Sequence, residues 1–373
     1  MKKYLYLSLC GCVAVGALLT GVSMSKPALT AIVPAPLELR LPKCWRTPPA
    51  WASPKAEPML QPAASAVSPK WTSLPNIPLG RSEAQIASVG GKIFVFGGYT
   101  SLTIITPTFD VHVYNPSTSK WTHLNDMPVG LTHSGVAVDG QFIYFAGGYP
   151  PTPERTYQIY GTTMAWRYNT VNDTWTSLPP LPSARGAGAM ACVSNVLHYF
   201  SGADSTRTDS HSHWALNLAN LKSGWTTAAP IPTARNHLGT AVLGTIIYAI
   251  GGAHNQDAAE TALPTVEFYN PATNKWTTGP SLPTPRALIQ SSVTTLNGKI
   301  IVAGGETAYN DPTAQVTSFN PATGTWTQLN PLPSPRMAGL CAVQGNNLIF
   351  TTGAYWYAPG VFSTTAWLGT FGS

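Results

Sequence analysis

The sequence predicts an all-β fold in which six four-stranded sheets are arranged radially. Three observations predict it. Tryptophans recur over residues 71–373 at intervals of 50, 54, 50, 51 and 50 residues, which is typical of repeat architectures. Each interval holds short apolar runs of strand length between turn residues. Gly (33) and Pro (34) are abundant and only 10% of residues are charged, which excludes a coiled coil and a disordered chain.

Each repeat offers four strands in a fixed order. A motif such as WTSLPNIP leads into a small-residue strand, and an apolar strand that ends in a Gly pair follows, as in IFVFGG. A variable loop then reaches a third strand that ends near an aromatic residue, as in VHVYNP, and a short turn returns to Trp. The repeated residues are Trp71, Trp121, Trp175, Trp225, Trp276 and Trp326, with the pairs Gly97 and Gly98, Gly147 and Gly148, Gly251 and Gly252, and Gly304 and Gly305.

The two ends of the repeat region complement each other. One such sheet cannot bury both of its faces, but six packed radially can, and paired glycines let neighbouring backbones approach closely. The repeats begin with a lone fourth strand at Trp71 and end after a third strand near residues 363–370. We therefore expect the N-terminal strand to complete the sixth sheet and close the ring.

These motifs resemble the kelch repeat, whose Gly-Gly, Tyr and Trp signature and period near 50 match over about residues 71–373. The resemblance implies a six-bladed kelch β-propeller. Repeat 3 departs from the pattern with Ser201, Gly202 and Leu216. Repeat 6 has Thr352 and Gly353 and stops before its Trp.

Residues 1–25 predict export. Two lysines precede an uncharged stretch over residues 4–25, the pattern of a secretory signal. Three interpretations are open: cleavage after Ser25, an uncleaved membrane anchor, and lipidation of Cys12 in a lipoprotein-like box. Each places the remaining chain outside the cytoplasm, as a periplasmic, secreted or membrane-tethered protein.

The net charge of +6 lies outside the repeats. Residues 71–373 contain 13 Lys and Arg and 13 Asp and Glu, whereas residues 26–70 carry a net charge of +4. Residues 26–70 also contain ten prolines, which predicts a semi-rigid spacer. We therefore expect no nucleic-acid partner, membrane contact only through the N-terminal segment, and a monomeric propeller.

The cysteines do not predict a disulfide framework. Cys192 and Cys341 occupy matching positions in repeats 3 and 6, and opposite blades are too far apart for a disulfide. We expect both to be small core residues. Cys44 in the spacer is left as an unpaired thiol.

Strand order places two sets of loops on one face: those before the first strand and the variable ones after the Gly pair. We call this the loop face, and expect function there. Arginine begins the first strand in five repeats, and Leu131 replaces it in repeat 2. These arginines predict a partial cationic ring around the central channel; the alternative is turn residues that bond backbone carbonyls or pack on the next blade. In eukaryotic kelch proteins, which this chain resembles, arginines here commonly contact acidic peptides. The set is Arg81, Arg185, Arg235, Arg286 and Arg336.

Aromatic residues are dense in the loops of the same face. They suit stacking on sugars or anchoring of a partner protein, and the alternative is packing on neighbouring loops. With the arginines, they predict a binding module for a protein, peptide or glycan ligand. The set is Tyr99, Tyr149, Tyr157, Tyr160, Tyr309, Tyr355, Trp356 and Tyr357.

Two sets of titratable residues are candidates for catalysis or metal binding. Glu83, His133 and His237 each lie two residues after the arginine position, where they could form an acid–base pair or part of a metal site, or simply be hydrogen-bonded strand ends. In an extended strand, alternation would point Asp209, His211 and His213 toward one metal; a plain polar loop is the alternative. No phosphate-binding loop can be singled out, and we expect no cofactor.

An enzymatic alternative comes from a second resemblance. Exported six-bladed kelch proteins include bacterial N-acetylneuraminate mutarotases, which interconvert sialic acid anomers with a Glu after a second-strand Gly and an Arg in the same loop. Here Glu306 follows the Gly pair of repeat 5, but residues 307–315 contain no Arg. Repeat 3 offers Asp204 and Arg207. The resemblance implies these three residues as candidate catalytic groups.

Overall fold

Each repeat forms one antiparallel sheet of four strands in sequential order. The protein is represented by a computed structural model that describes residues 68–101, 105–256, 260–355 and 362–372. The predicted signal, the predicted spacer before residue 68 and Cys44 all belong to residues outside these ranges. Blades 1 to 3 consist of β2 (Gln85–Val89), β3 (Lys92–Phe96), β4 (Val111–Asn115) and β5 (Lys120–His123); β6 (Gly135–Asp139), β7 (Phe142–Ala146), β8 (Ala165–Asn169) and β9 (Thr174–Ser177); and β10 (Ala189–Val193), β11 (Val196–Phe200), β12 (His213–Asn217) and β13 (Thr226–Thr227).

Blades 4 and 5 repeat this plan. Blade 4 inserts a ribbon of β16 (Ala253–His254) and β17 (Thr261–Ala262) before its third strand, and blade 3 carries the short 3-10 helix η2 (Leu221–Ser223) before its last strand. None of the helices in the described part of the chain is long and apolar enough to cross a membrane. The strands are β14 (Gly239–Leu243), β15 (Ile246–Ile250), β18 (Val266–Asn270) and β19 (Lys275–Thr278); and β20 (Val293–Leu296), β21 (Lys299–Ala303), β22 (Val316–Asn320) and β23 (Thr325–Leu329).

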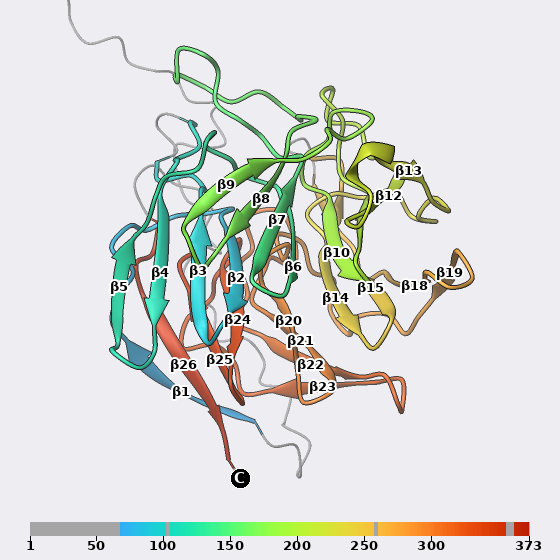
Figure 1. The fold of residues 1–373 in the computed structure, drawn as a ribbon. Coiled ribbons are helices and arrows are strands. Elements are labelled where there is room, and N and C mark those ends of the chain that lie inside the picture. The colour runs from blue at the N-terminus through green and yellow to red at the C-terminus, as the bar shows by residue number, and fades with distance from the viewer. Residues whose placement is uncertain (1–67, 102–104, 257–259, 356–361, 373) are drawn as a thin grey trace, which may run out of the picture. The chain divides into compact units, whose positions relative to one another are not determined.

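The sixth blade contains both ends of the repeat region, as predicted. It combines β24 (Leu340–Gln344), β25 (Asn347–Thr351) and β26 (Ala366–Phe371) with β1 (Pro69–Leu74) as the outermost strand (Figure 1). In the antiparallel register Trp71 lies opposite Gly369, where a Cβ atom would come within 2.8 Å of the indole. The innermost strands contact one another in the order β2, β6, β10, β14, β20 and β24, and β24 contacts β2. The six-bladed propeller is therefore closed.

The glycine pairs connect neighbouring blades. In all six blades the second residue of the pair donates its backbone N–H to the carbonyl at the arginine position of the next blade, over 2.8–3.0 Å. This second position is Gly in every blade, with φ between 82 and 105°. The first position is less restricted, because Ser201 and Thr352 occupy it in blades 3 and 6 at φ of 62 and 58°.

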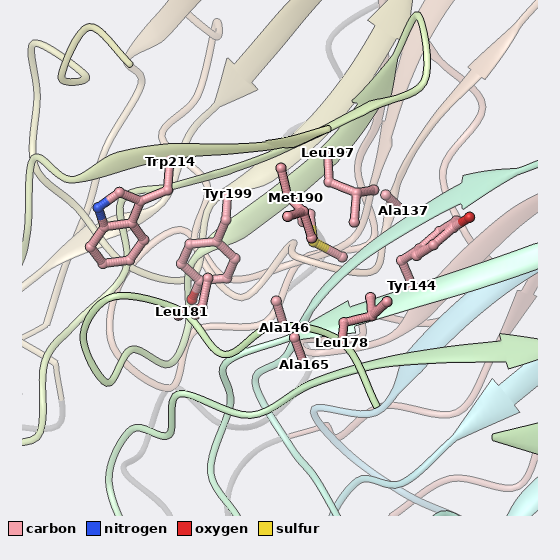
Figure 2. Close-up of a cluster of buried hydrophobic side chains, with 11 residues drawn as sticks. Ala137, Tyr144, Ala146, Ala165, Leu178, Leu181, Met190, Leu197, Tyr199 and Trp214 are labelled. Atoms are coloured by element: carbon pink, nitrogen blue, oxygen red, sulfur yellow. The ribbon is translucent and has the colours of Figure 1, made fainter. Parts of the chain in front are cut away.

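The core is divided among the interfaces between blades. Figure 2 shows one cluster, in which Tyr144, Leu178 and Leu181 of blade 2 pack against Leu197 and Tyr199 of blade 3. Five of the six repeated tryptophans, all but Trp175, contribute at the outer edge, where an indole N–H donates to a backbone carbonyl of the preceding blade. These bonds run from Trp121 to Pro75, from Trp225 to Pro179, from Trp276 to Ala229, from Trp326 to Pro280 and from Trp71 to Asn330.

Candidate functional site

The arginines do not form an exposed cationic ring. Arg81, Arg235, Arg286 and Arg336 have no solvent-exposed surface. Their guanidinium groups lie inside the blades. Arg81, Arg235 and Arg286 donate to backbone carbonyls at the end of the second strand, and Arg336 donates mainly to hydroxyl groups. Arg286, for example, donates to the carbonyls of Gly304 at 2.9 Å and Gln315 at 3.3 Å. An arginine can satisfy several carbonyls at once, which explains why the repeat retains it. The expectation of a channel-lining ring is wrong for these four.

Two of these arginines face buried polar partners. Arg235 forms an ion pair with Glu267, whose side chain is 2% exposed, and Arg81 lies 2.8 Å from Nδ1 of the buried His112. Burial lowers the pKa of Arg81 to about 10, although Asp110 acts against this shift. The ion pair compensates the buried charge of Arg235 within its own blade.

Arg185 and Arg336 differ because each also packs on an aromatic ring. Arg185 is half-buried, donates to Ser210 and Ser212 at 3.0 and 3.1 Å, and lies 5.1 Å above the Trp214 ring. Arg336 donates to the Tyr355 hydroxyl at 2.8 Å and lies 3.7 Å from the centre of that ring. Tyr355 is 38% exposed, whereas Trp356 and Tyr357 lie outside the described residues.

A ring of left-handed residues surrounds the propeller axis at the loop face. The residue two positions after each arginine position has φ between 49 and 55° in all six blades. Backbone hydrogen bonds link these residues from blade to blade, as in Ala187 to His133 and His237 to Ala187, both at 2.9 Å. In an extended strand the arginine and the residue two positions later would point to the same side. The left-handed backbone at the later residue separates them, so that the arginine is buried in the blade while the later residue reaches the axis. The six residues are Glu83, His133, Ala187, His237, Leu288 and Ala338.

Three of these residues converge. His133 Nε2 lies 2.6 Å from Glu83 Oε2, and one ligand atom from each of Glu83, His133 and His237 lies within 4.8 Å of the others. The three come from blades 1, 2 and 4, and blades 2 and 4 are not neighbours, so their side chains meet near the axis. We call them the axial cluster. Their donor atoms could hold a metal ion or exchange a proton.

The axial cluster is buried and its electrostatics reflect this. The side chains of Glu83, His133 and His237 are 8, 4 and 2% exposed. Burial, and next the nearby His133, lower the pKa of His237 to about 3, while Glu83 acts in the opposite direction. The His237 imidazole is therefore neutral at ordinary pH, and a neutral imidazole can donate at one nitrogen and accept or ligate at the other.

Two of the predicted loop tyrosines cover the cluster instead of facing solvent. Tyr149 is fully buried, and its ring centre lies 4.3 Å from that of His133. Its hydroxyl donates to Gln256 at 2.7 Å. Tyr99 is 3% exposed, donates to Gln158, and packs edge-on against His133. The prediction that Tyr99 and Tyr149 contact a ligand is therefore wrong, because neighbouring loops bury both side chains.

The exposed aromatic surface lies in the loop between β7 and β8. Tyr157 and Ile159 are 43% and 45% exposed. Thr106 donates to the Arg155 carbonyl from blade 1, and Arg155 lies 4.4 Å above the Phe109 ring. From blade 3, Arg207 lies 4.8 Å above the Tyr160 ring. We call this surface the loop platform, made of Arg155, Tyr157, Ile159, Tyr160 and Arg207.

The predicted metal motif in blade 3 does not converge. Asp209 accepts from Asn236 at 2.6 Å and lies 3.1 Å from His254 Nδ1. His211 is exposed and its Nδ1 donates to Ile231 O, while the buried His213 donates to Ala229 O and lies 3.0 Å from His198. The strand β12 begins only at His213, so strand alternation does not apply to Asp209 and His211, and the expectation of one shared metal is wrong.

The residues that the mutarotase resemblance implies lie in two loops, Asp204 and Arg207 together in blade 3 and Glu306 in blade 5, and each has a local role. Asp204 accepts from the backbone N–H groups of Thr206 and Thr208, at 2.8 and 3.1 Å, and so shapes its own turn. Glu306 is 1% exposed and accepts from the backbone of Asn310 at 2.9 Å. Arg207 packs on Tyr160, as described above. Glu306 is in blade 5, whereas Asp204 and Arg207 belong to blade 3.

A cavity extends along the central channel of the propeller. It has a volume of about 570 Å³ and follows the axis, lined by the innermost strands of all six blades. Gly91, Val138 and Gly345, in the hairpins opposite the loop face, belong to its lining, and so does Ser134, the neighbour of His133. The lining of the channel therefore reaches from the hairpins to the residue beside His133. Cys341 lines it as a buried thiol, and burial raises its pKa to about 12; Cys192 is only partly buried.

A second group of possible ligands lies on the outside of blade 1. His123 Nε2 is 3.4 Å from Asp110 and 3.1 Å from Asp126, and all three side chains are at least 36% exposed. Solvent-exposed pairs of this kind contribute little to stability. This exposed group therefore contrasts with the buried axial cluster.

Comparison with known proteins agrees with this architecture. A family model described as the KLHDC2/KLHL20/DRC7 Kelch-repeats domain matches residues 162–353, which is half of the chain, and a Kelch motif model matches residues 80–128. The chain belongs to the kelch-repeat family. No curated protein matches it. A solved structure described as "Structure of YjhT" superposes with a TM-score of 0.65 at 14% identity, covering 79% of this chain and 96% of that one. At this identity the likeness shows the fold alone.

Proposed function

We propose that this protein is an exported binding module that takes a protein, peptide or glycan ligand on its loop face. The observation that carries the proposal is the loop platform. Tyr157 and Ile159 are exposed on a loop that is fixed to blades 1 and 3, so the apolar surface is held in place before a ligand arrives. Preorganised aromatic side chains of this kind dominate binding energies.

The platform also indicates the chemistry of the ligand. Arg155 is exposed and packs over the Phe109 ring, so its guanidinium stands at the edge of the platform, where a ligand can reach it. An arginine fork recognises carboxylates, while a tyrosine ring stacks on an apolar peptide side chain or a sugar. We therefore propose a ligand that joins an acidic group to a flat or apolar face, as in acidic peptides and acidic glycans.

Binding of the full-length protein to peptide and glycan arrays tests this function. We expect Tyr157→Ala and Arg155→Ala each to weaken the strongest ligand by roughly 10-fold, about 1.4 kcal/mol. Val171→Ala is the matched control, because Val171 is 74% exposed in the β8–β9 turn on the opposite face. A ligand whose affinity falls in the control and not in the platform variants would show that the loop face is not the binding surface.

Export is the second part of the proposal. It is supported by the two lysines and the uncharged stretch of residues 4–25. Cell fractionation of the full-length protein with a C-terminal tag, compared with Lys2→Glu and Lys3→Glu together, tests it. Recovery of the wild type in the cytoplasm would contradict export and leave the binding test unaffected.

A further inference from the structure

The axial cluster has the composition of a metal site. We propose that Glu83, His133 and His237 bind one divalent transition-metal ion, with Zn²⁺ as the reference case. The ligand atoms come from three blades and lie within 4.8 Å of one another, so small side-chain rotations would bring them around a single ion. This inference concerns the propeller axis and does not depend on the loop platform.

A buried nitrogen supplies the second observation. His237 is 2% exposed, and its Nε2 atom is buried without a hydrogen-bond partner. A buried polar atom without a partner is costly and rare in native proteins, and it calls for an explanation. A bound metal ion explains it, because Nε2 of a neutral imidazole is a common ligand atom.

The other nitrogen of each imidazole already has an oxygen partner. His133 Nδ1 lies 2.8 Å from Thr132 Oγ1, and His237 Nδ1 lies 2.6 Å from Asn236 Oδ1. When Nδ1–H donates to these oxygens, Nε2 carries the lone pair that a metal requires. Metal-ligating histidines in proteins are usually oriented in this way.

The local charges also suit a divalent ion. Glu83 supplies one buried carboxylate, and Glu260, 4% exposed, lies 3.5 Å from His237 Nδ1 and supplies another. Two carboxylates balance the charge of a divalent cation in a region from which water is largely excluded. Two nitrogens and one carboxylate favour Zn²⁺ and its transition-metal neighbours over Ca²⁺ and Mg²⁺, which prefer oxygen ligands. Three protein ligands leave a position for water or another small molecule.

The fold offers variants that remove a ligand without disturbing the backbone. Ala187 and Ala338 occupy the same ring position in blades 3 and 6, with φ of 54 and 49°, close to the 51° of His237. His237→Ala therefore introduces a residue that the propeller already uses at this position. Leu288→Ala makes a similar truncation at a ring position without a ligand atom, and His123→Ala removes the histidine of the exposed group on blade 1.

The experiment uses metal-stripped full-length protein, equilibrated with Zn²⁺ and measured by calorimetry, with Co²⁺ absorption as a second readout. We expect one ion per chain, at least a ~100-fold loss of affinity in His237→Ala and in Glu83→Gln, and no change in Leu288→Ala or His123→Ala. Near-UV circular dichroism identifies any variant that fails to fold, and His133→Ala then replaces it. Binding that survives His237→Ala and Glu83→Gln, or that is lost in His123→Ala, would overturn the proposal, and so would wild-type protein that binds no Zn²⁺.

Discussion

The backbone N–H of Gly353 donates to the carbonyl oxygen of Arg81 over 3.0 Å, and this bond joins the last blade to the first. The same donor and acceptor positions join all of the remaining pairs of neighbouring blades. Closure between blades 6 and 1 therefore repeats the ordinary interface, and β1 adds the outer strand that only this blade takes from the other end of the chain.

Deleting residues 68–78 should destabilise the whole propeller. The deletion removes β1 and leaves the outer edge of β26 unpaired, including the contact between Trp71 and Gly369. Because the blades depend on a closed ring, we expect a lower midpoint of thermal unfolding and a new tendency to associate through the open edge. Calorimetry and light scattering measure both effects, and an unchanged unfolding midpoint would contradict the role of β1.

Arg235→Ala should cost about 3–5 kcal/mol of unfolding free energy, because Glu267 is left buried without its cation. Arg185→Ala should cost less, since Arg185 is only half-buried and donates mainly to serines. Urea unfolding of the two variants measures the difference. Equal losses would mean that Arg235 has no special structural role.

Gly252→Ala should be more harmful than Gly244→Ala, although both glycines belong to blade 4 and have positive φ. At Gly252, with φ of 100°, a new Cβ atom would lie 2.6 Å from Asn236 O, whereas at Gly244 it meets nothing within 4 Å. We expect an additional loss of about 1–3 kcal/mol at Gly252, from strain and a weakened bond to Arg286. Chemical denaturation measures the stability of both variants. Equal losses would show that the left-handed backbone alone, and not the close contact at Gly252, sets the loss of stability.

Acid should destabilise the fold between about pH 6.5 and 4 through His198 and His213. Burial lowers the pKa of both to about 4, with His213 a further cause for His198. The unfolded chain therefore binds more protons in this window, so stability is complete above pH 6.5 and falls toward pH 4, by on the order of 3 kcal/mol for each imidazole. His198→Asn retains a donor toward His213 but cannot titrate. A variant with the wild-type pH slope would contradict this assignment.

Sialic acid anomerisation should not be accelerated by the purified protein. Asp204 shapes its own turn and Arg207 packs on Tyr160 in the same loop of blade 3, while Glu306 is buried in blade 5, so each of these groups already has a structural role. Proton NMR of freshly dissolved sialic acid measures the rate directly. Acceleration that is lost in Glu306→Gln would restore the enzymatic interpretation.

The periodic residues predicted the fold because most of them have the same role from blade to blade. Trp121 and Trp326 both bond to the preceding blade, and the invariant second glycine makes the same contact each time. The spacing of such residues therefore predicts the number of blades, the strand order and the closure of the ring by β1.

The candidate site was less predictable because it depends on directions that residue types do not reveal. An arginine such as Arg286 can serve a ligand or several carbonyls, and only the structure shows its burial. His133 and His237 were recognised as equivalent repeat positions, but their meeting depends on left-handed backbone that strand alternation does not anticipate. Long-range contacts, such as that of Arg207 with Tyr160, fix the platform loop to two blades, and the sequence does not reveal which residues make them.

The arrangement of blade 6 also constrains how the chain reaches its native state. Residues that pair in this blade are as much as 302 positions apart in the sequence, as Pro69 and Phe371 are. During synthesis β1 emerges before β26 and must wait for it, so the ring closes only after the sixth blade has been made. A polypeptide that lacks β26 leaves β1 without the strand it pairs with. Ring closure thus requires both ends of the repeat region in the same molecule.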